Sequence, residues 1–161
     1  MKCAIPIRVL RRFRPSVAAE DGQALVEFAL ILPLLMLVVA MVLEFGKAFH
    51  HWQDENHLAN LAARLASVDS KPGSDTLQSY VLSQSDTPEL KNGGTDSVAD
   101  PAKVCIDFPD GSAVGKPVKA TVTVTYKWMP ILGGVASSTL TGSATMRMER
   151  PATKYSEGCS S

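Results

Sequence analysis

The sequence predicts an α+β protein, with one long amino-terminal helix followed by a small antiparallel sheet. Two observations lead to this prediction. The stretch from Phe28 to Leu43 is apolar throughout and carries no charged residue. Much later, residues 118–128 alternate between apolar and polar side chains, which is the pattern of a strand with one buried face.

The apolar run is long enough to cross a membrane as a helix. From Gln23 to Leu43 it would span about 31 Å, close to the roughly 30 Å hydrocarbon core of a bilayer. A cleavable secretory signal would be shorter and would end in small residues, and residues 42–45 (VLEF) offer no such site. We therefore expect residues 23–45 to remain as a transmembrane helix.

The charges around this run predict its orientation. Basic residues precede it, namely Lys2, Arg8, Arg11, Arg12 and Arg14, and no comparable cluster follows it. The amino terminus should therefore stay in the cytoplasm, and the chain beyond residue 46 should be translocated. Phe45, Phe49 and Trp52 then fall where an outer aromatic belt would lie.

The helical pattern continues past the membrane. An apolar stripe at helical spacing and an alanine-rich stretch predict one helix over residues 23–68, about 69 Å long, so that residues 46–70 extend the helix into the periplasm. Residues 70–73 (SKPG) should end it. Pro33 cannot donate its backbone hydrogen bond, so it either kinks the helix near residues 29–33 or is simply tolerated there.

Residues 71–161 should form a small α+β domain. We expect a short helix over 75–83 capped by Ser74, a polar surface loop or mobile connection over 85–99, and a strand near 104–108. Two further strands, over 118–128 and 139–149, would pair through a long tip at Met129–Ser138 that contains Pro130 and the Gly133-Gly134 pair. This sheet of about three strands would lay its apolar face on the outer half of the long helix.

Glu27 lies at the start of the apolar run, where a charge needs a physical reason. A carboxylate costs roughly 3 kcal/mol at the centre of a membrane helix and less near the interface. Glu27 could therefore simply reach water at the cytoplasmic border. Alternatively it could pair with a new amino terminus made by a cut after Gly22. Glycine suits the position before a cut, because an extended backbone can then enter a protease site without a side chain.

Three segments resemble one protein family. Residues 22–35 (GQALVEFALILPLL), 43–48 (LEFGKA) and 58–64 (LANLAAR) resemble the TadE-like family of minor pseudopilins. The resemblance covers about residues 20–68 closely and implies a pilin-like fold. It also implies that a prepilin peptidase removes a leader of residues 1–22, leaving Gln23 as the mature amino terminus and Glu27 as the fifth mature residue. Many pilins begin with Phe instead, and the departure at Gln23 favours the tight-adherence branch.

The resemblance further implies a structural role in assembling the tight-adherence (Flp, type IVb) pilus, and thus in adhesion and biofilm formation. The implied partners are the prepilin peptidase, other pilins or pseudopilins, the inner-membrane assembly platform and the lipid bilayer. The protein would cross the bacterial inner membrane once, with its carboxyl-terminal domain in the periplasm, and could also enter the fibre. The alternative is an uncleaved signal-anchor protein that presents a periplasmic interaction or ligand-binding domain.

Charge and motifs argue against other classes of protein. Of 16 basic and 16 acidic residues, five and two precede Gln23, which leaves 11 and 14 and a formal charge of −3. No basic patch with interleaved aromatics follows the leader, so we expect no nucleic-acid binding. His50 and His57 share a helix face but lie about 10 Å apart, too far for one metal. Without a catalytic motif, we expect no enzyme activity, cofactor or metal.

The cysteines predict a possible cross-link. Cys3 would leave with the leader, whereas Cys105 and Cys159 lie in the translocated part, where an oxidising compartment favours a disulfide. Cys105 has the opposite strand parity to its apolar neighbours, so it should face away from the helix, and the tail could fold back along that face. Closing this loop of roughly 55 residues would contribute about 4 kcal/mol. Two unpaired thiols are the alternative.

Overall fold

The computed structural model describes residues 20–73, 75–129, 133 and 136–160. The expected leader up to residue 19, with Cys3, the Ser74 cap and most of the hairpin tip, including Pro130 and Gly134, lie outside the described residues. The chain divides into two compact units, Met1–Met41 and Val42–Ser161, and the boundary between them falls inside the first helix.

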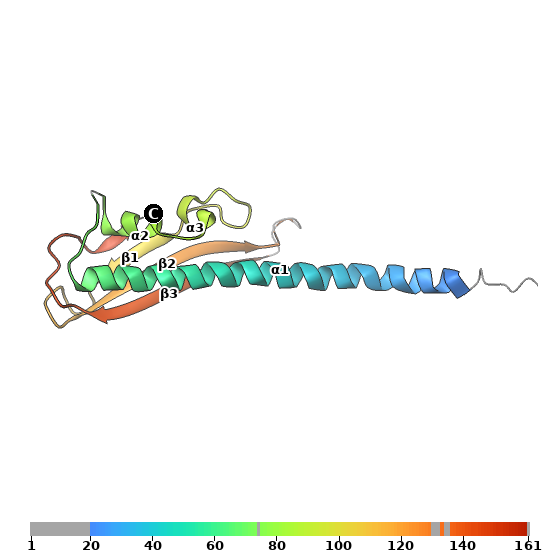
Figure 1. The fold of residues 1–161 in the computed structure, drawn as a ribbon, viewed down its shortest axis with the longest axis horizontal. Coiled ribbons are helices and arrows are strands. Elements are labelled where there is room, and N and C mark those ends of the chain that lie inside the picture. The colour runs from blue at the N-terminus through green and yellow to red at the C-terminus, as the bar shows by residue number, and fades with distance from the viewer. Residues whose placement is uncertain (1–19, 74, 130–132, 134–135, 161) are drawn as a thin grey trace, which may run out of the picture. The chain divides into compact units, whose positions relative to one another are not determined.

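That first helix, α1, runs over Glu20–Ser67 and contains Pro33 (Figure 1). It confirms the long amino-terminal helix expected from the sequence, with ends shifted by one to three residues. The backbone turns to a positive φ of 52° at Asp69, and the Ser70 amide donates 2.9 Å to the Leu65 carbonyl. A left-handed residue just beyond the last turn is a common way for a helix to stop.

The sheet has four antiparallel strands in the order β3-β2-β1-β4. They are β1 (Lys103–Asp107), β2 (Pro117–Trp128), β3 (Ala136–Arg147) and β4 (Gly158–Ser160). β2 and β3 form the expected hairpin, with Pro117 opposite Arg147 and Trp128 opposite Ala136. The sequence predicted about three strands, and β4 is the addition, because a three-residue strand carries no detectable alternation.

The core lies between one face of the sheet and three helices. On β2 the buried residues are Val118, Ala120, Val122, Val124 and Tyr126, all of one parity, as the alternation predicts. Within the second unit they share one cluster with alanines and Leu58 of α1 and with Leu77 and Leu90 of two short helices. Figure 1 shows these short helices, α2 and α3, beside β1. The opposite face of the sheet stays largely in solvent.

Gly142 sets how closely β3 approaches α1. A Cβ added at Gly142 would lie 2.5 Å from the backbone nitrogen of Asn56, with the Glu55 backbone in equally close contact. Any side chain there would push backbone against backbone. Glycine on the strand and alanines on the helix together allow this close packing of helix and sheet.

The segment before β1 differs from the sequence expectation in two places. Helix α2 spans Leu77–Ser83, two residues shorter than expected, and its cap is Thr76, whose Oγ1 accepts from the Ser79 amide at 3.2 Å. The prediction of a surface loop over 85–99 is wrong at α3 (Pro88–Asn92). Its physical reason is the fully buried Leu90, one apolar anchor in a segment that is otherwise polar.

Candidate functional site

The predicted cut lies within the first turn of α1. The helix begins at Glu20, so the peptide bond between Gly22 and Gln23 is helical in the uncut chain. A Cβ built on Gly22 has no neighbour within 4 Å. A protease that needs extended backbone would have to unwind only this first turn, and glycine makes that turn less stable than alanine would by about 1 kcal/mol.

Gln23 and Glu27 are already neighbours. The Gln23 side-chain amide donates to Glu27 Oε1 at 3.2 Å, one turn along the helix. A cut after Gly22 would place a new ammonium group on the very residue that contacts Glu27. The structure thus brings together Gly22, Gln23 and Glu27 at the start of α1, while Pro33 lies alone further along it. The kink at Pro33 stays a prediction.

Beyond Glu27, α1 exposes large apolar side chains on every side. The exposed set comprises Phe28, Leu30, Ile31, Leu32, Leu34, Leu35, Met36, Leu37, Val38, Val39, Met41, Val42 and Leu43. Among the described residues, α1 is the helix long and apolar enough to cross a membrane, and its most apolar stretch buries nothing within the chain. Such a surface needs lipid or other apolar helices around it.

The helix changes character at Glu44. The Tyr126 hydroxyl of β2 donates to Glu44 Oε2 at 3.0 Å, and both residues are buried. Burial, with the hydrogen bond to Glu44, raises the pKa of Tyr126 to about 12. The folded domain therefore packs on α1 from Glu44 onward, two residues inside the range expected to lie in the membrane.

An aromatic row marks the opposite side of the same turns. Phe45 and Phe49 stack with ring centroids 6.4 Å apart, and Phe49 lies 5.7 Å from Trp52. All three are partly or largely exposed, whereas Glu44, Ala48 and His51 face the domain. Trp and aromatic side chains are common at membrane–water interfaces, so the row agrees with the expected outer aromatic belt, which stays a prediction.

Two adjacent carboxyl groups of α1 are buried under the domain. Asp54 is hydrogen-bonded, because its Oδ2 accepts from the Ser85 hydroxyl at 2.6 Å and from the Thr87 amide at 3.0 Å. Glu55 is fully buried, and neither of its oxygens has a partner in the described part of the chain. Burial, and then the charge of Asp54, raise the pKa of Glu55 to about 8, so it is protonated at neutral pH.

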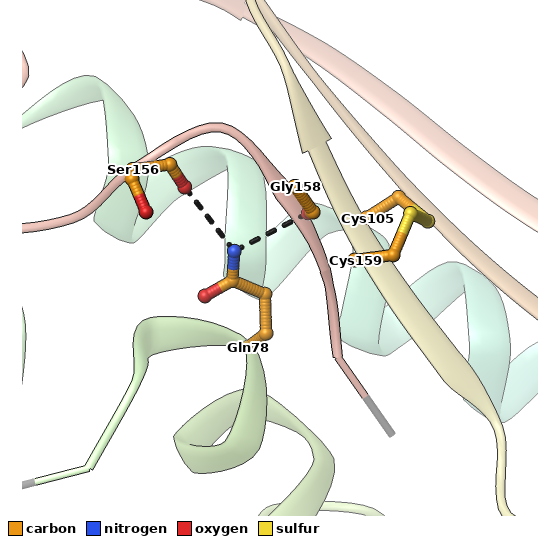
Figure 2. Close-up of a disulfide and its surroundings, with 5 residues drawn as sticks. All are labelled: Gln78, Cys105, Ser156, Gly158 and Cys159. Atoms are coloured by element: carbon orange, nitrogen blue, oxygen red, sulfur yellow. Dashed lines mark hydrogen bonds between the residues drawn. A yellow bond between two sulfur atoms is a disulfide. The ribbon is translucent and has the colours of Figure 1, made fainter.

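The carboxyl-terminal tail folds back on the outer edge of the sheet. β4 pairs with β1 so that Cys105 lies opposite Cys159, and the structure joins the two sulfurs as a disulfide (Figure 2). The Gln78 side chain donates to the Ser156 and Gly158 carbonyls at 3.2 and 3.3 Å and holds the tail against α2 (Figure 2). That the bridge forms after export stays a prediction, which non-reducing peptide mapping would check.

Asp69 fixes the start of the same tail. It accepts from the Thr153 and Lys154 amides at 2.9 and 3.0 Å, and from the Thr153 hydroxyl. Desolvation opposes ionisation, but these hydrogen bonds outweigh it and lower the pKa of Asp69. Sequence reasoning missed Asp69, Asp54 and Glu55. For Asp54 and Glu55 the sequence held one clue to their burial, because helical spacing places them on the same face as the apolar Leu58.

No group of three or more His, Cys, Asp or Glu side chains is arranged to hold a metal ion among the residues that the structure describes. His50 and His51 lie side by side, with ring centroids 6.3 Å apart. What the described residues do present is an exposed apolar surface along α1, followed by a domain packed on the same helix.

Comparison with known proteins found a resemblance over most of α1. Residues 22–64 match the family model described as TadE-like protein, and the match begins at Gly22 itself. Neither the curated proteins nor the solved structures gave a match. The matched residues cover the predicted cut, the apolar surface and the turns of α1 under the domain, but not the sheet. TadE-like proteins are associated with the tight-adherence pilus and are structural and not enzymatic.

Proposed function

We propose that this chain, TadE-like over residues 22–64, is a minor pseudopilin of the tight-adherence (Flp) pilus. In this role a prepilin peptidase cuts after Gly22, and the mature protein stays anchored in the inner membrane by residues from Gln23 to about Leu43. Its folded domain then lies in the periplasm, where it supports pilus assembly and hence adhesion and biofilm formation. The assembly platform and other pilins or pseudopilins are its partners.

One observation carries the proposal. The family match begins at the residue before the expected cut, and the helix that follows places Gln23 in contact with Glu27. An uncleaved signal anchor would need neither the glycine nor the carboxylate. The wholly exposed apolar surface after Glu27 adds support, because a pseudopilin must hold this surface in lipid before it meets another subunit.

The sharpest test of the assembly role exchanges Glu27. In a strain that lacks the gene, the wild-type chain should restore surface pili, and Glu27→Ala should restore far fewer while still being cut. The physical reason is that the new ammonium group would lose its counter-charge in a low-dielectric setting. Pili counted by electron microscopy, with the processed band followed by immunoblot, would measure both effects.

The matched control is Glu157→Ala, an exposed carboxylate far along the chain, which should restore pili fully. Normal piliation with Glu27→Ala would instead show that Glu27 only reaches water at the membrane border. Normal piliation in the strain without the gene would contradict the proposed function as a whole.

A further inference from the structure

A pocket of about 410 Å³ lies at the end of the folded domain where α1 enters it. One wall comes from α1, through Glu44, Lys47, His50 and His51. The other comes from the α2–α3 connection and α3, residues 86–89, and from the turn at residues 95–97. All of these residues belong to the second unit.

The pocket carries an excess of negative charge. Its acidic lining residues are Glu44, Asp86, Glu89 and Asp96, and its one lysine is Lys47. Lys47 lies 3.8 Å from Glu44, but its side chain is 64% exposed, so it compensates a single carboxylate weakly. Burial lowers the pKa of His51, which therefore adds no positive charge at neutral pH.

The walls are held by hydrogen bonds from several elements. Asp54 ties Ser85 and Thr87 to α1, Tyr126 ties Glu44 to β2, and the Lys127 amide donates to the Ser97 carbonyl at 2.8 Å. The segments that carry the four acidic residues are thus fixed in place around the pocket. A fixed set of like charges is stabilised by a bound ion of opposite sign.

Two buried polar atoms in the walls also lack partners. His51 and Thr87 are 6% and 3% exposed, and within the described residues neither His51 Nδ1 nor Thr87 Oγ1 has a hydrogen-bond partner. Unsatisfied buried polar groups are costly and uncommon, so a pocket ligand that donates to these two atoms would be stabilised. A ligand with several N–H donors would suit an imidazole nitrogen, a hydroxyl and carboxylates alike.

We propose that this pocket binds a cationic side chain, Arg or Lys, of a neighbouring protein subunit. A guanidinium group brings five N–H donors and a permanent charge. A zwitterionic lipid headgroup fits less well, because its phosphate would enter the same field of carboxylates. That the neighbour is a pilus component rests on the proposed function, whereas the preference of the pocket for a cation does not.

The test uses the purified full-length chain in detergent micelles. N-acetyl-arginine amide is added at constant ionic strength while NMR follows the His51 ring and the amides of residues 86–97. N-acetyl-citrulline amide, which has nearly the same shape and no charge, is the matched probe. The arginine probe should shift these signals in a saturable way, and the citrulline probe should not.

Paired variants decide where the probe binds. Asp86→Asn with Asp96→Asn, both exposed and outside the hydrogen bonds of the walls, should weaken binding of the arginine probe by roughly tenfold, because two nearby charges are lost. Asp75→Asn with Asp110→Asn, equally exposed but outside the pocket, should leave it unchanged.

Several results would overturn the proposal. These are an equal response to both probes, no response to the arginine probe at tens of millimolar, or equal affinities in the two double variants. If the same NMR signals shift only when the chain is placed in vesicles that contain phosphatidylethanolamine, and not with the arginine probe, the pocket binds a lipid headgroup instead. None of these outcomes bears on cleavage or piliation, so the proposed function and this inference fail separately.

Discussion

The two halves of α1 are both helical, but one exposes its apolar side chains and the other buries them. From Phe28 to Leu43 the helix exposes large apolar side chains all around, whereas from Glu44 to Ser67 it buries one face, which carries Leu58, several alanines and a few polar groups. The large side chains occur where the contacts must come from outside the chain. In the second half Gly142 lets β3 meet the helix backbone at Glu55 and Asn56, and the buried alanines Ala59, Ala62, Ala63 and Ala66 follow it along the helix. The two halves therefore differ in whether the chain itself covers their apolar side chains.

Leucine truncation in each half tests this comparison most strongly. Leu58 is fully buried, so Leu58→Ala should lower the free energy of unfolding of the domain by about 3 kcal/mol. Leu34 is 65% exposed, and Leu34→Ala should leave that free energy unchanged. Urea unfolding in micelles, followed by tryptophan fluorescence from the half-buried Trp128 and the partly exposed Trp52, would measure both. Equal losses in the two variants would show that the halves do not differ as described.

Two glycines sharpen the comparison. Gly142→Ala should destabilise the domain by about 2–3 kcal/mol, because the new methyl group meets the backbone of Glu55 and Asn56. Gly46→Ala, on α1 with open space around it, should instead stabilise the protein by up to about 1 kcal/mol. Thermal unfolding should show a lower melting temperature for Gly142→Ala and a higher one for Gly46→Ala. A Gly142→Ala protein as stable as the wild type would contradict the close approach of β3 to α1.

The buried carboxyl group of Glu55 predicts a pH dependence. Its pKa rises from 4.5 in the unfolded chain to about 8 in the folded one, so the folded state keeps a proton that the unfolded state releases. Stability should therefore fall as pH rises through this window, by about 1.6 kcal/mol between pH 6.5 and 8. The lowered pKa of His51 changes stability mainly below pH 6.5, its ordinary pKa. The raised pKa values of Tyr126 and Tyr155 change stability only above about pH 10.

Glu55→Gln provides the control, since glutamine keeps the shape of the protonated side chain but cannot titrate. Urea midpoints measured from pH 6.5 to 8 should fall for the wild type and stay level for Glu55→Gln. Parallel curves for the two proteins would mean that Glu55 is ionised, or solvated, in the folded state.

The comparison also explains what the sequence could predict. The helix and the β2–β3 hairpin were predictable, because their periods extend over many residues and each buries one face. α3 and β4 were not, since each is held by one or two contacts: Leu90 in the core for α3, and pairing with β1 for β4. Periodicity cannot show such contacts. The pocket is harder still to predict from the sequence, because its walls come from segments up to 53 residues apart, from Glu44 to Ser97.

The candidate site divides in the same way. Gly22 and Glu27 could be singled out from the sequence because they are local and interrupt a pattern, a glycine before an apolar run and a charge inside it, and their roles stay predictions. Asp54 and Glu55 follow no such pattern, and their burial depends on the loop at Ser85–Thr87 and on β3. A charge is recognised as unusual from sequence only when its sequence neighbours already predict an apolar environment, as they do for Glu27 and do not for Asp54 and Glu55.

Intact-mass analysis of the protein purified from membranes tests the central claim most directly. In cells with an active prepilin peptidase, the mature chain should begin at Gln23 and lose about 2.5 kDa of its 17.2 kDa. In cells without the peptidase, the full mass should remain. A chain that still begins at Met1 when the peptidase is active would contradict the account.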